Sequence, residues 1–364
     1  MKITFLCPEI SQGGGSRVIA IYARKLLEMG HDVTVVSRQP KPVSPQRALL
    51  DRLKGKPVPG DPQARTVHFD FLGDRHRWLP WKWPLDVEDL PDADILIATW
   101  WRTAFEAVMM PPEKGAKAYF VQHHEVFDHL PRDLSSASYR LPLKKITIAD
   151  WLVDTMADLY GDTDVIKVEN SVDTEQFNAP PRQRNATPRI GFLYAQNPFK
   201  GVDISLKAIE IVREQVPGLA VMAFGSSPPV RDLPLPKGAE FHLDPAQASL
   251  RGLYASCDVW LCGSRAEGFH LPPLEAMACH TPVVATRVGG TVETVTDGVN
   301  GYLVDVEDAT ALGARLIDVL SLSPEDWRTM SEAAYARAHA YSWDTAAARF
   351  EAALTEIVSK ARGS

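Results

Sequence analysis

The stretch that decides the fold is Arg265-Ala-Glu-Gly-Phe-His-Leu-Pro-Pro-Leu-Glu-Ala-Met-Ala278. It follows the apolar run Asp258-Val-Trp-Leu-Cys-Gly263, which predicts a buried parallel strand. Its proline pair is typical of the first turn of a helix. The chain here is therefore predicted to fold as strand, glycine-containing turn and helix. Free N–H groups and the positive end of the helix dipole point out of such a turn, which suits a phosphate or diphosphate.

Two glutamates accompany this turn. Glu267 lies just before it, and Glu275 lies inside the helix. A carboxylate does not neutralise phosphate, but it accepts protons from the two hydroxyls of a diol such as ribose. The expected ligand is therefore a nucleoside diphosphate that carries a further group near Glu267. Two solvated glutamates on a helix face are the alternative interpretation.

This pattern resembles the E-x7-E motif of family-4 retaining glycosyltransferases, which have the GT-B fold. The Gly-Phe-x-Leu-Pro after Glu267 and the later Thr281-Pro-Val-Val-Ala-Thr-Arg-Val-Gly-Gly290 belong to the same resemblance. It implies an α/β protein with two Rossmann-like, doubly wound domains facing across a cleft, and a C-terminal helix that crosses back to the N-domain. The implied activity is a retaining hexosyl- or deoxyhexosyltransferase that uses a nucleotide sugar and a glycan or lipid-linked acceptor.

Size and composition agree with a two-domain globular protein. The 364 residues exceed one ordinary domain of about 150, and 45% are hydrophobic while 23% are charged. No apolar run is long enough to cross a bilayer, and the first residues are too quickly polar for a signal peptide, so we expect a cytoplasmic protein. The four cysteines lack the paired spacing of a zinc site. The net charge of -7 argues against general nucleic-acid binding.

The sequence predicts four segments. They are an acceptor-side domain at 1–177, a polar, proline-rich linker at 178–188, a nucleotide-sugar-binding domain at 189–341 and a crossover helix at 342–364 that packs on the first domain.

The first domain carries a basic insertion at about 38–92. Between Arg38 and Lys82 there are ten Lys or Arg against four Asp, and the stretch ends in Trp78-Leu-Pro-Trp-Lys-Trp83. Basic residues mixed with tryptophan suit an anionic membrane interface or a phosphorylated acceptor. An irregular insertion whose tryptophans fill a core is the other interpretation, and both stay open.

The chain begins with a predicted strand, glycine turn, helix and strand at 2–8, 12–16, 17–29 and 32–37. By resemblance, Gly14 and Gly15 belong to the loop that approaches the donor phosphates or the acceptor. Val18 stands where the third glycine of a dinucleotide fingerprint would be, which disfavours a nicotinamide fold.

Further residues follow the ends of predicted strands. The strand at 94–98 leads into Trp100, Trp101 and Arg102, and the strand at 118–122 leads into two histidines. Residues just past the carboxyl ends of parallel strands line the ligand crevice, so we predict an acceptor side there.

By resemblance, His123 is the histidine near the transferred sugar, and His124 is its acceptor-side neighbour, which can point the other way. The sequence next predicts a helix at 144–160 and a strand at 164–173. Asn170-Ser-Val-Asp173 with Phe177 resembles the N-G-V-D-x-x-x-F signature of the family, with Ser171 in place of glycine.

In the second domain, Lys200-Gly201 lies between a predicted strand at 189–195 and a helix at 202–216. It resembles the family's K-G, whose lysine contacts the donor diphosphate. Two positions depart from the family. Ala195 replaces a common phosphate-binding arginine, whose charge Arg265 or Arg287 can supply, and His270 replaces a glycine. The turn either tolerates the histidine side chain, or the imidazole contacts donor phosphate.

Residues and resemblance together predict the site. The catalytic residues are His123, Lys200 and Glu267; the donor-binding residues are Gly14, Gly15, Lys200, Gly201, Gly225, Arg265, Gly268, Phe269, His270, Leu271 and Glu275; the acceptor-side residues are Trp100, Trp101, Arg102 and His124.

We expect no metal or other cofactor. Lys200 and the N–H groups of Phe269, His270 and Leu271 are predicted to stabilise the leaving diphosphate. Asp92-Ala-Asp94 precedes its strand and so lies at the wrong end of the sheet for a metal site. No residue is identifiable as a covalent nucleophile, which favours same-face substitution. A nucleotide-sugar epimerase of the same fold and a catalytically silent nucleotide-sugar-binding protein are the alternatives.

Overall fold

The computed structural model describes residues 1–10, 13–38, 44, 46, 67–79 and 82–363. The chain separates into unit 1, which comprises Met1–Ile148, Leu152–Glu169 and Asp344–Ser364, and unit 2, which comprises Ala149–Trp151 and Asn170–Trp343. Most of the predicted basic stretch, including Trp81, lies outside the described residues.

Unit 1 contains a seven-stranded parallel sheet in the order β3-β2-β1-β4-β5-β6-β7. Its central strands are apolar and buried on both faces, as expected of a parallel sheet covered by helices. The strands are β1 (Lys2–Glu9), β2 (Asp32–Arg38), β3 (His76–Leu79), β4 (Ile95–Ala98), β5 (Ala116–Val121), β6 (Lys144–Thr147) and β7 (Ile166–Lys167).

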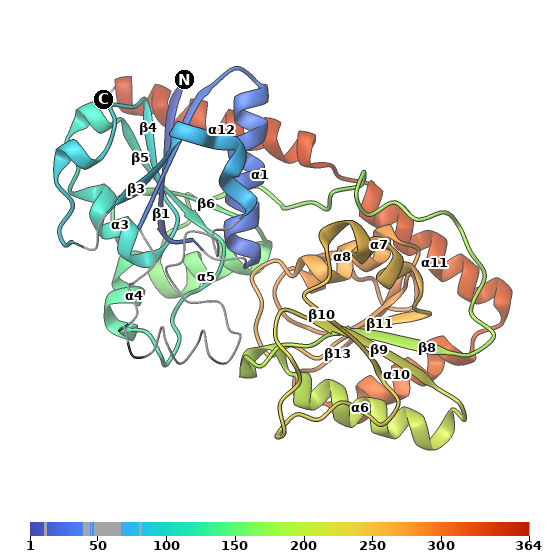
Figure 1. Cartoon of the computed structure of the whole chain (residues 1–364). Helices are drawn as coiled ribbons and strands as arrows, with labels where there is room; N and C mark the ends of the chain where they lie inside the picture. Colours follow the sequence, from blue (N-terminus) through green and yellow to red (C-terminus); the bar gives the residue numbers. More distant parts are fainter. Residues whose placement is uncertain (11–12, 39–43, 45, 47–66, 80–81, 364) are drawn as a thin grey trace. The chain divides into compact units, whose positions relative to one another are not determined.

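The C-terminal helix returns to this sheet, as the fold class predicts. The ring of Phe350 stacks 4.4 Å from Tyr22 and lies 5.1 Å from Phe120 of β5, and Figure 1 shows the helix in red beside the blue elements. The helices are α1 (Gly14–Glu28), α3 (Trp101–Val108), α4 (Arg132–Ser138), α5 (Asp150–Tyr160) and α12 (Trp343–Gly363), with 3-10 turns η2 (Val67–Arg75), η3 (Val87–Asp89) and η4 (Pro112–Lys114).

The prediction of one helix at 144–160 is wrong. The segment forms β6 and then α5, because Ile146-Thr-Ile148 supplies β-branched residues that are buried on both faces of the sheet. The buried ammonium of Lys145 is accommodated by an ion pair of 2.6 Å with Asp162. The strand predicted at 164–173 is limited to β7.

Unit 2 contains a six-stranded parallel sheet in the order β10-β9-β8-β11-β12-β13. The strands are β8 (Arg189–Leu193), β9 (Ala220–Gly225), β10 (Glu240–Leu243), β11 (Val259–Cys262), β12 (Val283–Thr286) and β13 (Gly301–Val304). The helical segments are η5 (Pro198–Lys200), α6 (Val202–Gln215), α7 (Gln247–Ala255), α8 (Leu271–Ala278), α9 (Thr291–Thr294), α10 (Ala309–Ser321) and α11 (Pro324–His339).

Both sheets change direction of winding beside their first strand. In unit 1 the reversal falls between β1 and β4, and in unit 2 it falls between β8 and β11. In open α/β sheets a ligand binds at the carboxyl ends of the strands on either side of such a reversal. A ligand site in unit 2 is therefore expected at the loops after β8 and β11.

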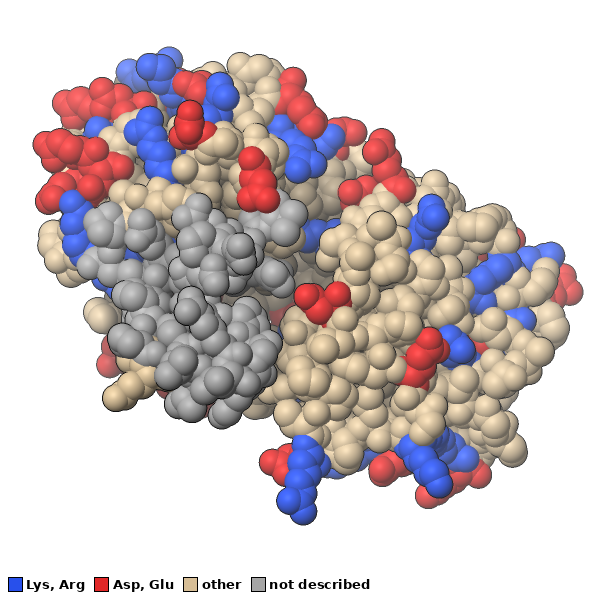
Figure 2. Space-filling view, viewed as in Figure 1, with Lys and Arg blue, Asp and Glu red and all other residues tan. Residues whose placement is uncertain are grey.

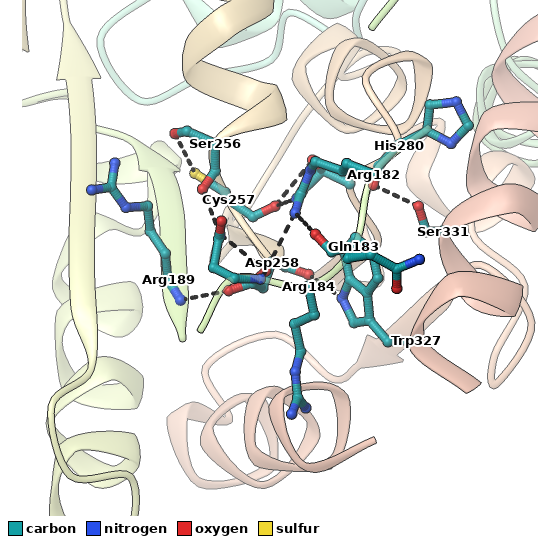
Figure 3. A network of polar contacts seen from close by, with 12 residues as sticks. Arg182, Gln183, Arg184, Arg189, Ser256, Cys257, Asp258, His280, Trp327 and Ser331 are labelled. Carbon is teal, nitrogen blue, oxygen red and sulfur yellow. Dashed lines mark hydrogen bonds and ion pairs between the residues drawn. The ribbon is translucent and has the colours of Figure 1, made fainter. Parts of the chain in front are cut away.

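A buried carboxylate holds the opposite, amino end of the unit 2 sheet (Figure 3). Asp258 precedes β11, is fully buried, and accepts hydrogen bonds from the backbone N–H groups of Asn185 at 2.9 Å and Arg189 at 2.8 Å. Its carbonyl accepts a bond from the Trp327 indole at 2.9 Å, and the Arg182 guanidinium lies 4.7 Å from that ring. This network fixes the segment before β8 to the sheet and to α11.

None of the helices in the described ranges is both long and apolar enough to cross a membrane. On the face drawn in Figure 2, acidic and basic side chains are interspersed over the described surface of unit 1.

We predict that Asp258→Ala destabilises unit 2 by about 2–4 kcal/mol, because several buried donors lose their acceptor. Urea unfolding followed by circular dichroism measures this loss. Asp318→Ala is the control: its ion pair with Arg315 is half exposed, so we expect a change within about 0.5 kcal/mol. Equal effects of the two substitutions would contradict the role of Asp258.

Candidate functional site

Lys200 reaches the end of β11 because of the glycine that follows it. Gly201 has left-handed backbone angles (φ 57°, ψ 34°), and a Cβ there would lie 1.8 Å from the carbonyl oxygen of Gly263. Only glycine allows this approach of the two loops. The carbonyl of Phe199 also accepts a bond of 2.7 Å from the N–H of Arg265. The loop after β8 is thereby fixed against the loop after β11.

The centre of the site is an ion pair between Lys200 and Glu267. The Lys200 Nζ lies 2.9 Å from both carboxylate oxygens, and the Ser264 hydroxyl donates to Oε1 at 2.7 Å. Burial alone would raise the pKa of the Glu267 carboxyl, but His270, Lys200 and Ser264 hold this pKa below its usual range. The Lys200 side chain is 23% exposed and that of Glu267 only 7%, so the ammonium is the more open partner.

Backbone donors lie beside this pair at the start of α8. The N–H groups of Phe269, His270 and Leu271 donate to no carbonyl or side chain among the described residues. Pro272 and Pro273 follow in the first turn and have no N–H to offer. The predicted anion-binding capacity therefore depends on these three N–H groups, the positive end of the helix and the nearby ammonium.

Gly289 and Gly290, which follow β12, pack against the loop that contains Glu267, Gly268 and Phe269. Gly289 has φ 52°, and a Cβ there would lie 2.5 Å from the carbonyl oxygens of Glu267 and Gly268. A Cβ on Gly290 would lie 2.5 Å from the carbonyl oxygen of Phe269, and its N–H donates to Gly268 at 3.1 Å. Sequence reasoning used these glycines only as part of a resemblance and assigned them no role. Two consecutive glycines shortly after a buried strand were the available signal.

Glu275 lies within α8 and is 5% exposed. One carboxylate oxygen accepts a bond of 2.7 Å from the hydroxyl of Tyr254 on α7. Burial, and then the charge of Glu275, raises the pKa of Tyr254 well above its ordinary value, so this hydroxyl stays a donor. Glu275 lies about 6 Å along the helix axis from Leu271, four residues at the usual rise. No motif in the sequence indicated Tyr254.

The arginines near the site have carboxylate partners. The Arg265 guanidinium makes two bonds of 2.8 Å to Asp203 and pairs with Glu307, and Arg287 pairs with Asp297 at 2.9 Å. The proposal that Arg265 compensates for Ala195 therefore stays a prediction, and it would require this arginine to share its charge. Gly225 ends β9 against the carbonyl of Tyr194, where a Cβ would approach to 2.3 Å.

His270 is the residue at the N-cap of α8. Its backbone is left-handed (φ 71°, ψ 74°), its exposed fraction is 8%, and its Nε2 lies 3.4 Å from Oε1 of Glu267. Burial lowers the pKa of the imidazole to about 4, and the attraction of Glu267 offsets only part of that shift. The ring is therefore neutral near pH 7.

In unit 1, Gly14 and Gly15 begin α1 rather than precede it. The side-chain amide of Gln122 donates to the Gly15 carbonyl at 3.3 Å, and a Cβ on Gly14 would meet nothing within 4 Å. Within the described residues, packing therefore gives no reason for glycine at position 14.

The predicted acceptor-side residues lie at the start of α3. Trp100 is the N-cap residue, Trp101 is buried at 9% exposure, and Arg102 is half-buried. The Arg102 guanidinium lies 4.8 Å from the centre of the Trp83 ring and its Nε lies 3.9 Å from Glu106.

The two histidines differ in their surroundings. His123 Nδ1 lies 3.1 Å from the carbonyl of His124, and its ring lies 5.0 Å from that of Phe127. His124 Nε2 lies 2.7 Å from the hydroxyl of Tyr160, and its ring is 5.3 Å from Tyr139. Burial, and then His123, lowers the pKa of His124. His124 is therefore engaged by aromatic residues of unit 1.

Sequence reasoning missed the carboxyl of Glu125, which lies beside the predicted residues of unit 1. Its Oε2 accepts a bond of 3.2 Å from the N–H of Trp101, and its own N–H donates to Tyr139 at 2.8 Å. Burial raises its pKa to about 8, and the bond from Trp101 only partly opposes that shift. Glu125 therefore holds the start of α3. Its position after β5, directly beside the two histidines, was the signal in the sequence.

Part of this chain is similar in sequence to known proteins. Residues 187–321 match the family described as glycosyl transferases group 1. Over 214 residues the chain is 31% identical to the D-inositol 3-phosphate glycosyltransferase of Streptomyces griseus, covering 51% of this chain and 45% of that protein. It is also 31% identical over 249 residues to the O-antigen biosynthesis protein RfbC of Myxococcus xanthus, covering 65% of this chain and 19% of that protein. The chain thus spans less than half the length of these relatives.

Solved structures resemble the whole chain. The sucrose-phosphate synthase of Thermosynechococcus elongatus matches with a TM-score of 0.75 and 17% identity over 99% of both chains. The Anabaena protein HepE, solved with UDP-glucose, matches with a TM-score of 0.74 and 16% identity over 98% of this chain and 100% of its own. The protein has the GT-B fold, and residues 187–321 of unit 2 match the model of the group 1 glycosyltransferases. These findings confirm the resemblance to GT-B glycosyltransferases.

We predict that Glu125→Gln is more stable than the parent protein at pH 8 by about 1–3 kcal/mol and equally stable near pH 4.5. The folded protein favours the protonated carboxyl of Glu125. The contribution of Glu125 to stability is therefore complete below pH 4.5, the pKa of this carboxyl in the unfolded chain, and is lost as the pH rises through about 8, its pKa in the folded protein. Urea unfolding at both pH values measures this. Glu113→Gln, at an exposed position, is the control. A pH dependence that Glu125→Gln leaves unchanged would refute the assignment.

Proposed function

We propose that this protein is a glycosyltransferase. It moves a sugar from a nucleoside-diphosphate donor to a hydroxyl of a glycan or lipid-linked acceptor, with retention of configuration and without a metal ion. The observation that carries the proposal is the Lys200–Glu267 pair beside the N–H groups of Phe269, His270 and Leu271, which have no acceptor among the described residues.

The diphosphate is the group that these donors suit. Loss of the diphosphate is the difficult step, because negative charge grows on its oxygen as the sugar carbon becomes cationic. An ammonium and fixed N–H groups stabilise that charge without rearrangement, and such preorganised stabilisation is usually the largest single contribution to catalysis. Lys200 would then divide its bonds between Glu267 and a phosphate oxygen.

The two carboxylates suit hydroxyl donors. Glu267 is ionised and accepts hydrogen bonds only, so a hydroxyl of the transferred sugar fits it. Glu275 accepts a hydrogen bond from the hydroxyl of Tyr254 and lies further along α8, where its carboxylate suits the ribose. The structure of the GT-B protein HepE with UDP-glucose supports a nucleotide sugar as the ligand class.

Bond exchange on one face of the sugar accounts for retention. The bond between the anomeric carbon and the phosphate oxygen breaks, the acceptor oxygen bonds to that carbon from the same side, and the acceptor's proton passes to the leaving phosphate. The residues of unit 1 after β4 and β5, with His123 among them, are proposed to hold the acceptor. For a lipid-linked acceptor, we also propose that the protein contacts an anionic membrane. The 49% exposure of Trp83 supports this part of the proposal.

A silent nucleotide-sugar-binding protein is the second candidate, favoured by Ala195 and by the carboxylate partners of Arg265. Incubation with a panel of nucleotide sugars in EDTA, with and without soluble and lipid-linked glycan acceptors, tests both. Acceptor-dependent release of nucleotide supports the transferase, and binding without turnover supports the silent protein. Release of an altered free sugar without acceptor would instead identify an epimerase of this fold.

We predict that Lys200→Ala lowers kcat by about 100-fold or more, because the leaving diphosphate loses its ammonium. Steady-state nucleotide release with the active donor measures the change. Lys237→Ala removes an exposed lysine of the same unit and should leave kcat unchanged. If Lys200→Ala turned over at the parental rate, the diphosphate could not lie at this site.

We predict that Glu275→Ala weakens binding of the nucleoside diphosphate by about 10-fold or more, because ribose loses its acceptor. Isothermal titration calorimetry measures the affinity. Tyr254→Phe, which removes only the hydroxyl bonded to Glu275, should have a smaller effect. An unchanged affinity in Glu275→Ala would place the ribose elsewhere.

A further inference from the structure

His270 keeps a side chain where the backbone disfavours one. At φ 71° and ψ 74° a residue other than glycine costs about 1 kcal/mol relative to glycine. The side chain itself is 4% exposed, so this polar ring is also buried. A buried polar group in a strained backbone is a reason to look for a function.

The position of the ring fixes where its proton lies. Nε2 is 3.4 Å from the ionised carboxylate of Glu267, and a lone pair facing that charge would be repelled. The neutral ring therefore places its single N–H on Nε2. Nδ1 then carries a lone pair and acts only as an acceptor.

This acceptor is unused. Nδ1 of His270 is buried and has no hydrogen-bond partner among the described residues. An orphaned buried acceptor costs about 1–3 kcal/mol until a donor reaches it. A diphosphate diester carries no proton near pH 7 and has no donor to offer, and the nearby N–H groups and ammonium already suit it. A hydroxyl does have the required donor.

We propose that Nδ1 of His270 accepts a hydrogen bond from a hydroxyl of the transferred sugar, a different hydroxyl from the one that Glu267 accepts. The inference rests on the proposed function and deepens it. Two acceptors, one on Glu267 and one on His270, require a sugar with hydroxyls at two positions, and a donor sugar that lacks the hydroxyl at His270 is rejected. His270 would therefore determine donor specificity. A sugar without this hydroxyl would leave the buried Nδ1 without a hydrogen bond, which disfavours its transfer.

Two variants separate this role from simple packing. His270→Gly removes the ring and relieves the left-handed backbone, so it should fold at least as well as the parent. His270→Asn keeps an acceptor oxygen at about the position of Nδ1 and tolerates the same backbone. The first should lose the discrimination, and the second should restore part of it.

The first measurement uses the donor found in the nucleotide-sugar panel and its monodeoxy analogues. The parent should discriminate by about 10-fold or more in kcat/KM against one analogue through His270. In His270→Gly that ratio should fall to within about two-fold, while discrimination at the other hydroxyls persists. An unchanged pattern of ratios in His270→Gly would overturn the inference.

The second measurement is nitrogen-15 NMR of histidine-labelled protein, with the His270 signals assigned from His270→Asn. The free protein at pH 7 should show Nε2 protonated and Nδ1 unprotonated. Addition of the nucleotide sugar should shift Nδ1, and addition of the nucleoside diphosphate alone should not. A proton on Nδ1 in the free protein, or an equal shift with the nucleoside diphosphate, would contradict the inference. Absence of binding by every nucleotide sugar would instead refute the proposed function.

Discussion

The arrangement of the site depends on one partly buried ion pair, between Lys200 and Glu267, at the carboxyl edge of the unit 2 sheet. Removing two charges from water is costly, and their attraction offsets that cost only when the geometry is good and the remaining acceptors are satisfied. Here the ammonium reaches both carboxylate oxygens, and Ser264 donates to one of them. The pair keeps Glu267 ionised inside the protein while leaving the ammonium partly open.

Close backbone contacts hold the pair in place. Gly201 lets the loop after β8 pack against the end of β11, and Gly289 and Gly290 pack against the backbone that follows Glu267. None of these positions tolerates a Cβ without movement of main-chain atoms. The same constraint leaves the N–H groups at the start of α8 without acceptors among the described residues, so the loop that supports the charges also presents the donors.

The local pattern of the sequence predicted the β11–α8 unit and the spacing of Glu267 and Glu275, because apolar runs, prolines and glycines act within a few residues. It did not predict Tyr254 beside Glu275, or Asp203 and Glu307 beside Arg265, because these partners are distant in sequence. The error at 144–160 arose where a four-residue strand precedes a helix without a glycine or proline between them. Glu125 was missed because its raised pKa depends on burial, which no motif records.

The most direct test of the ion pair as a diphosphate site is the pKa of Glu267, measured by carbon-13 NMR of glutamate-labelled protein and assigned with Glu267→Gln. In the free protein it should lie below the usual range of a glutamate. Saturation with a nucleoside diphosphate should raise it, because Lys200 turns part of its charge to the phosphate and a second anion comes close. The same pKa with and without bound nucleotide would contradict the account.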